Sequence, residues 1–143
     1  MTELQIKLCD VQGRLFENSV SAGFESESFA RAYMRSDVAR NYDRPFDHVQ
    51  WAGEGYLMEV LTDEERDELI KSEDGDRQFS PEVMYWMGYL YRYWHLLTGE
   101  SSREIYRQAD AKTMSENYFA FHTMSPELAV EDLKGLYQQK RKR

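Results

Sequence analysis

The fold of this chain is decided by residues 80–99, SPEVMYWMGYLYRYWHLLTG. Ser80 is a typical helix N-cap, Pro81 suits the first helical turn, and Glu82 places an acid near the positive end of the helix dipole. Gly99 tolerates a positive φ directly after Thr98, where many helices end. This pattern predicts a helix over residues 81–98.

Apolar and aromatic side chains cover most of the circumference of this predicted helix. Residues at helical spacing form two adjacent lines, Val83, Met87, Leu90, Trp94 and Leu97 beside Trp86, Tyr89, Tyr93 and Leu96. A helix that is apolar over most of its surface must be packed on most sides by others. We therefore expect the aromatic helix to lie at the centre of the fold.

The remaining narrow face of the aromatic helix carries Glu82, Tyr85, Gly88, Arg92 and His95. One interpretation makes it a polar cleft or partner contact, in which the missing side chain of the glycine lets a ligand or backbone approach. The other makes it an ordinary solvated or ion-paired strip, in which the glycine permits contact between two helices. We keep these side chains as candidate binding residues.

The rest of the chain carries helical spacing or helix-start signals over residues 4–15, 26–34, 36–42, 46–61, 62–69, 102–106, 110–121 and 125–136. No stretch alternates as a strand would. The sequence predicts an all-α fold, a single compact domain of about six to eight helices over residues 1–139. A basic tail, residues 140–143, follows it.

An acidic stretch lies between the two halves of the chain. Residues 62–65, Thr-Asp-Glu-Glu, have the form of a capping box and predict a short acidic helix through Leu69. Residues 71–78, in which Gly75 is flanked by aspartates, predict an exposed loop. The candidate partner contacts here are Asp63, Glu64, Glu68, Asp74 and Asp76.

Charge is distributed unevenly along the chain, which has a formal net charge of −8. Residues 1–80 carry a net −9, and residues 81–143 carry +1, including the four basic residues at the end. Such acidity repels phosphate backbones, so direct nucleic-acid binding is not expected. It suits a basic protein partner or the imitation of nucleic-acid charge, and simple solubility is the alternative explanation.

The sequence offers no catalytic or cofactor signature. His48, His95 and His122 are far apart, and none follows the spacing of a di-iron or zinc motif. Cys9 has no local electropositive setting, and no glycine-rich phosphate loop is present. We therefore expect no catalytic residue, metal or cofactor. An enzyme with a pocket beneath the aromatic helix, using Arg92, His95 and His122, stays open as an alternative.

The expected location is the cytoplasm. The single cysteine excludes an intrachain disulfide, and the N-terminus lacks the basic-then-apolar order of a signal peptide. The aromatic helix is too polar to span a bilayer, so no membrane association is expected.

Residues 102–118 superficially resemble a helix-turn-helix. The second helix would present five polar side chains outward, Lys112, Thr113, Ser115, Glu116 and Asn117. Against this, the turn lacks its glycine, and the interval from Ile105 to Met114 is shorter than usual. A DNA-binding regulator using this segment remains an alternative.

Several strings in the second half of the chain carry a family resemblance. They are YWMGYLYRYWHLLTGESS at 85–102, NY at 117–118 and FHTM at 121–124, with QWAGE at 50–54 in the first half. Over residues 25–136 the chain resembles small uncharacterised bacterial proteins associated with toxin–antitoxin loci and mobile elements. The resemblance implies a neutraliser or adaptor, and it assigns no role to any residue.

The leading functional hypothesis is a non-enzymatic, antitoxin-like protein that inhibits or neutralises a partner through its acidic helical surface. The partner would be a protein, either a toxin or a nucleic-acid enzyme. A phage-type inhibitor that imitates DNA charge, as an anti-CRISPR protein would, is the closest alternative.

Overall fold

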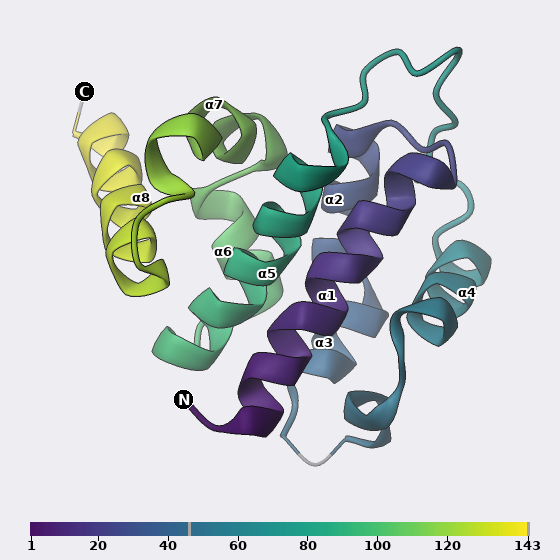
Figure 1. Ribbon diagram of the computed structural model, residues 1–143, viewed down its shortest axis with the longest axis horizontal. Coiled ribbons are helices and arrows are strands. Elements are labelled where there is room, and N and C mark those ends of the chain that lie inside the picture. The colour runs from purple at the N-terminus through teal and green to yellow at the C-terminus, as the bar shows by residue number, and fades with distance from the viewer. Residues whose placement is uncertain (46, 143) are drawn as a thin grey trace.

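Helices carry most of the chain in the computed structural model, which describes residues 1–45 and 47–142 apart from the side chain of His48 (Figure 1). The described residues form eight α-helices and one 3₁₀ helix. In chain order these are α1 Glu3–Ser21, α2 Ser26–Arg35, α3 Asp37–Asp43, η1 His48–Trp51, α4 Glu54–Glu64, α5 Pro81–Thr98, α6 Ser102–Gln108, α7 Ala111–Phe121 and α8 Pro126–Arg141. The predicted all-α single domain is confirmed.

Helix α5 begins and ends where the sequence predicts. The Ser80 hydroxyl accepts from the backbone N–H of Val83, and Pro81 occupies the first helical turn. At the other end Gly99 adopts φ 77° and donates its N–H to the carbonyl of His95. These local signals fix the position of α5 along the chain, because Ser80 and Gly99 each satisfy a backbone group at a helix end and Pro81 has no N–H to be left unpaired.

Helix α5 lies centrally, and α1 runs along its side (Figure 1). Two glycines make this contact close. A Cβ on Gly88 would lie 2.5 Å from the carbonyl oxygen of Gln12, and a Cβ on Gly13 would lie 2.8 Å from the ring of Tyr85. Neither position has room for a side chain, so Gly88 serves helix–helix contact, which was the second interpretation of the polar face.

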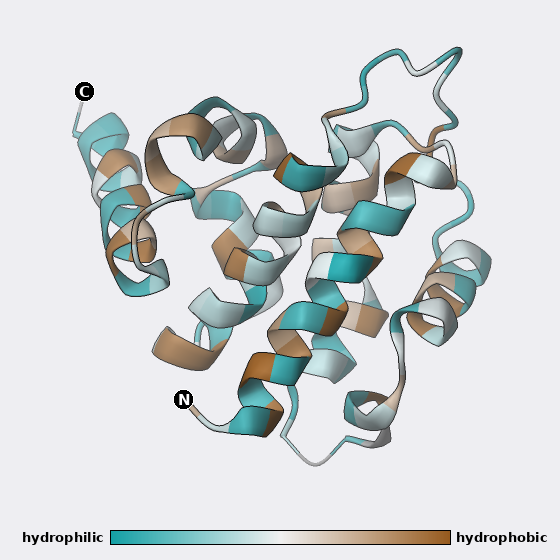
Figure 2. Ribbon diagram, in the orientation of Figure 1, coloured by the Kyte–Doolittle hydropathy of each residue, from teal (hydrophilic) through white to brown (hydrophobic). Residues whose placement is uncertain are grey.

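The core on the inner side of α1 and α5 is aromatic. Phe16 meets Phe29, Tyr33 and Tyr91 edge-on, with ring centroids 5.3, 5.4 and 6.0 Å apart. All four side chains are fully buried. Each such side chain contributes about 1.5–3 kcal/mol on burial, so this cluster, which joins α1, α2 and α5, is a main source of stability. Figure 2 shows hydrophobic and hydrophilic bands on the same helices, as amphipathic packing requires.

The acidic stretch differs from its prediction in detail. Residues 46–61 do not form one helix, because Ala52 and Gly53 are extended and separate η1 from α4; Phe46 lies outside the described residues. Thr62 is not an N-cap, since it lies inside α4 and donates its hydroxyl to the carbonyl of Met58. Burial of Leu57 and Leu61 holds this turn in α4, which ends at Glu64. A bend at Glu65 and a turn over residues 66–68 follow it in place of the predicted helix.

Two further predictions concern the ends of segments. The loop over residues 71–78 is confirmed, and an isolated bridge joins Lys71 to Phe24. The predicted basic tail is partly helical, since α8 continues through Arg141. Arg143 lies outside the described residues. None of the described helices combines the length and apolar character that a membrane crossing needs.

Candidate functional site

The arginine of the polar face, Arg92, lies in the interior of the fold. It is 1% exposed, and its guanidinium donates to Gln12 Oε1 from Nε at 3.0 Å and from Nη2 at 2.8 Å. Nη1 donates to Asp43 Oδ1 at 2.7 Å. Burial acts to lower the pKa of Arg92, but nearby Tyr33 and Asp43 outweigh it and raise that pKa. Arg92 therefore stays charged and joins α5 to α1 and α3.

The partners of Arg92 are themselves fixed by further hydrogen bonds. Gln12 donates to the carbonyl of Gly88 at 2.8 Å and accepts from the Tyr33 hydroxyl at 2.7 Å. Asp43 accepts from the backbone N–H and the hydroxyl of Ser102, at 2.9 and 2.7 Å. Among the described residues no buried side-chain nitrogen or oxygen lacks a partner. The network is complete without a ligand, which is the arrangement of a structural element.

This network corrects the choice of Arg92 as a partner contact, because a side chain that is almost fully buried cannot reach a partner in this fold. His95 is half-buried, and its Nδ1 and Nε2 lie 2.6 and 3.0 Å from the carbonyl oxygens of Glu100 and Asp43. Tyr85 is half-buried and donates to Asp10 Oδ1 at 2.5 Å. Of the side chains on this face, only Glu82 is exposed.

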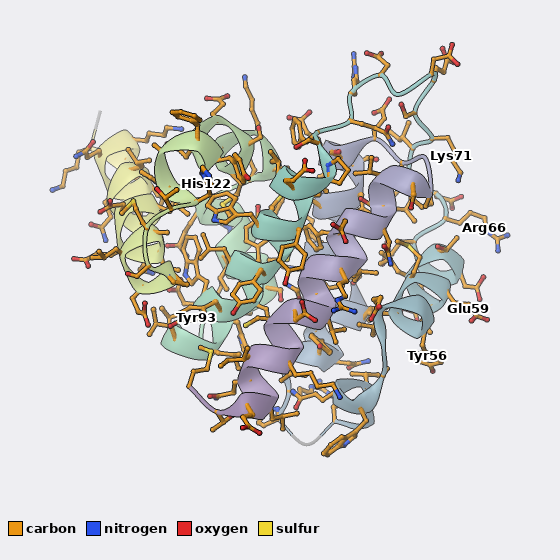
Figure 3. All side chains as sticks on the ribbon, viewed as in Figure 1. Tyr56, Glu59, Arg66, Lys71, Tyr93 and His122 are labelled. Atoms are coloured by element: carbon orange, nitrogen blue, oxygen red, sulfur yellow. The ribbon has the colours of Figure 1, made fainter. Side chains whose placement is uncertain are left out.

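The exposed charge lies instead in residues 54–76, α4 and the segment after it, which we name the acidic arm. This arm holds ten carboxylates and two basic side chains, a net of −8, which equals the formal charge of the whole chain. Eight of the ten are exposed, including all five predicted contacts, Asp63, Glu64, Glu68, Asp74 and Asp76. Figure 3 shows Glu59 and Arg66 at the outer edge of the molecule, directed away from the helices behind them.

The basic side chains of the acidic arm are already engaged. Arg66 pairs with Asp63 at 3.6 Å, and the Lys71 ammonium donates to the carbonyl of Ala22 at 2.8 Å. Burial, and after it the neighbouring Glu68 and Glu64, raises the pKa of Glu65. Crowded carboxylates therefore repel one another here, and a cationic surface placed against them would relieve that repulsion.

The base of the acidic arm is held to the junction of α1 and α2. The backbone N–H of Glu25 donates to the carbonyl of Ile70 at 2.8 Å, and that of Ser72 donates to the carbonyl of Gly23 at 2.7 Å. The Gln78 amide donates to the carbonyls of Val20 and Phe24, each at 3.0 Å. The carboxylates thus project from an anchored backbone.

A second surface feature is an aromatic groove of about 480 Å³ where α5 meets α7 and α8. Trp86 meets Tyr118 edge-on, and Tyr118 stacks on His122 with ring centroids 4.3 Å apart. His122 is exposed, while His95 and Arg92 lie elsewhere, in the contacts with α3. The three residues of the enzyme alternative are therefore not brought into one pocket.

The segment predicted as a helix-turn-helix forms α6 and α7, joined by Ala109 and Asp110. Three of its five proposed base-reading side chains are half-buried, and only Lys112 and Glu116 are exposed. The Asn117 amide donates to the carbonyl of Thr113 within the helix.

Sequence reasoning missed a set of five exposed arginines on α2, α3 and α6, Arg31, Arg35, Arg40, Arg103 and Arg107. Two pairs have i, i+4 spacing, which puts each pair on one helix face. That α2 and α6 lie side by side is visible only in the fold.

The chemistry of the other candidates is limited. Burial raises the pKa of the Cys9 thiol to about 12, which keeps it neutral. Within the described residues no three His, Cys, Asp or Glu side chains gather as metal ligands would.

Comparison of the chain with protein-family models, with curated proteins and with solved structures finds no match.

Proposed function

We propose that this protein is a non-enzymatic inhibitor or neutraliser that binds a basic protein surface through its acidic arm. The observation that carries the proposal is the concentration of the net charge. Residues 54–76 account for all of the −8, while the other 120 residues are balanced, with 16 acidic and 16 basic side chains. A charge gathered in one exposed segment supports a contact surface, because a single-sign field steers association, whereas solubility is served by charge spread over the molecule.

The anchored base of the arm supports this proposal. Because residues 70–72 and Gln78 are hydrogen-bonded to the α1–α2 junction, a partner does not have to order the whole segment when it binds. Complementary charge on the partner would speed encounter and set its orientation. Binding of this kind weakens with added salt.

The class of partner follows from the same charge. A surface rich in Lys and Arg is what nucleic-acid-binding proteins present to phosphates. An acidic protein that covers such a surface would block the enzyme beneath it, which is antitoxin-like action. An inhibitor that imitates DNA charge would use the same surface, and the identity of the captured enzyme separates the two.

The test starts with capture of partners on the immobilised wild-type chain, followed by direct measurement with the purified partner. Two variants of equal charge change are compared. The arm variant carries Asp63→Asn, Glu64→Gln, Glu68→Gln, Asp74→Asn and Asp76→Asn. The control variant carries five changes at other exposed carboxylates, Glu3→Gln, Glu27→Gln, Glu116→Gln, Glu131→Gln and Asp132→Asn.

The expected result is an affinity about tenfold or more lower in the arm variant, a smaller loss in the control variant, and inhibition of the partner's activity by the wild-type chain. Equal losses in the two variants would show that only total charge matters, and would overturn the assignment to the arm. Failure to recover any macromolecular partner at low salt would overturn the function.

A further inference from the structure

The five exposed arginines line two adjoining hollows between α2, α3 and α6, which we name the arginine groove. The first hollow, of about 330 Å³, is lined by Arg35, Arg40 and Arg103. The second, of about 610 Å³, is lined by Arg31, Arg35, Arg103 and Arg107. Arg35 and Arg103 line both hollows, so the two lie on either side of the same pair of arginines.

The groove is tied together by contacts between its helices. The Arg103 guanidinium donates through Nη2 to the backbone carbonyl of Arg35 at 2.7 Å, which links α6 to α2. Asp43, in the first hollow, already accepts from Arg92 and Ser102. Its charge is therefore compensated from inside the fold, and it does not neutralise the groove.

The groove arginines form no ion pair with a carboxylate of the described residues. In the described part of the chain, the arginines that form ion pairs are Arg14, Arg66 and Arg92, none of which lines the groove. Asp110 lines the second hollow but caps α7 through the N–H of Thr113. Glu27 is near enough to act on Tyr106, as Arg31 does, and the helices of the groove also carry Asp37 and Glu104, which are exposed and line neither hollow. In the lining of the groove, positive charge exceeds negative charge, although the whole protein has a formal net charge of −8.

Guanidinium groups bind phosphate oxygens through paired N–H donors, which an ammonium cannot do. Hollows of a few hundred Å³ suit a small molecule. The aromatic ring in the lining is Tyr106, which is 7% exposed and accepts from the N–H of Ala111, so it offers no face on which a base can stack.

We propose that the arginine groove binds a small ligand with adjacent phosphate groups, a diphosphate or triphosphate, and recognises the phosphates alone. Charge decides this class, because adjacent phosphates supply three or four negative charges within the length of one hollow. A nucleic-acid strand is disfavoured, since strand binding relies on exposed rings for stacking and the acidic arm would repel a long polyanion. This site is separate from the partner surface of the proposed function.

The test is calorimetric titration of the full-length chain with inorganic tripolyphosphate at low salt. Binding is expected, and the double variant Arg35→Gln/Arg107→Gln is expected to weaken it about tenfold or more. The single variant Arg107→Gln should weaken binding by a smaller factor. Arg66→Gln is its matched control, an exposed arginine outside the groove, and should leave the affinity unchanged. Arg107→Lys, which keeps the charge and loses the paired donors, should fall between wild type and Arg107→Gln.

Three further titrations separate the sources of phosphate. ATP is expected to bind as tightly as tripolyphosphate, and orthophosphate much more weakly. A single-stranded oligonucleotide that binds tighter than tripolyphosphate would overturn the proposal in favour of nucleic acid. Absence of tripolyphosphate binding at low salt would also overturn it, as would equal affinity in the double variant with helicity preserved by circular dichroism.

Discussion

The acidic arm and the arginine groove carry opposite charges, and they are built in different ways. The arm consists of one helix and a loop, in which Asp74 and Gly75 have positive φ, and its exposed carboxylates project from a backbone anchored at its base. The groove is made by side chains on three packed helices, which face shared hollows. Charge spread along a protruding segment suits a large partner, whereas charge gathered around a hollow suits a small one.

A buried ion pair affects the charge of the arginine groove. Arg92 neutralises Asp43 from below, and Asp43 lies in the first hollow of the groove. The buried arginine and the exposed ones therefore do different work. Arg92 holds helices together and keeps Asp43 from cancelling the charge of the groove, whereas the exposed arginines form no ion pair within the described residues and can meet an anion.

The largest expected effect comes from removing that ion pair. Arg92→Ala removes the guanidinium that pairs with half-buried Asp43 and donates to buried Gln12, and should lower the free energy of unfolding by about 3–5 kcal/mol. Urea denaturation measures this change. Arg107→Ala is the exposed counterpart and should change stability by less than about 0.5 kcal/mol. If Arg92→Ala and Arg107→Ala changed the free energy of unfolding equally, the buried arginine would have no special structural role.

The close crossing of α1 and α5 supports both regions, and it can be tested at its glycines. Gly88→Ala places a Cβ 2.5 Å from the Gln12 carbonyl oxygen, so α1 must shift. Overpacking of this kind should cost about 1–3 kcal/mol of unfolding free energy. Gly135→Ala in α8 meets no atom within 4 Å and should instead stabilise by about 0.5–1 kcal/mol. A neutral Gly88→Ala would contradict the close approach.

The hydroxyl of Tyr33 joins the Arg92 network to α2. Its contribution to stability can be tested by unfolding the protein at high pH. Burial raises the pKa of Tyr33 to about 12, above the ordinary tyrosine value of about 10. The native chain thus holds this proton more tightly than the unfolded chain, so the contribution to stability is full below about pH 10 and is lost as pH rises towards 12. Tyr33→Phe should reduce this slope in denaturation curves and cost about 1 kcal/mol at neutral pH. If stability fell with pH as steeply in Tyr33→Phe as in wild type, Tyr33 would not be the group responsible.

The smallest effect on the free energy of unfolding is expected in the acidic arm, whose charges we assign to partner binding. Neutralising the five predicted carboxylates relieves repulsion, so the arm variant should be as stable as wild type or more stable by a few tenths of a kcal/mol at low salt. Added salt should remove the difference. A marked loss of stability in the arm variant would mean that these carboxylates hold the fold.

Local features of the structure could be predicted from the sequence, and long-range features could not. Ser80, Pro81 and Gly99 act within a few residues of themselves, so the bounds of α5 were readable. Exposure of Asp74 and Asp76 followed from local composition. Burial of Arg92 depends on Gln12, 80 residues away, and on Asp43, 49 residues away.

The misread capping box has the same origin. Thr62 has the sequence of a helix start, but burial of Leu61 against the core decides that the turn belongs to the preceding helix. The arginine groove was missed because it exists only where α2 and α6 meet. A run of charged residues within one segment can be read from the sequence. A cluster of charges that comes from separate helices can be seen only in the fold.

The pairing of α1 with α5 has a consequence for how the chain acquires its structure. Gln12 and Gly88, which meet at the crossing, are 76 residues apart. During synthesis α1 therefore emerges long before its partner, and its apolar face stays uncovered until α5 has followed. Non-local pairing of this kind slows folding. A chain interrupted before residue 81 would lack the central helix, so we expect its first half to need a chaperone until the second half arrives.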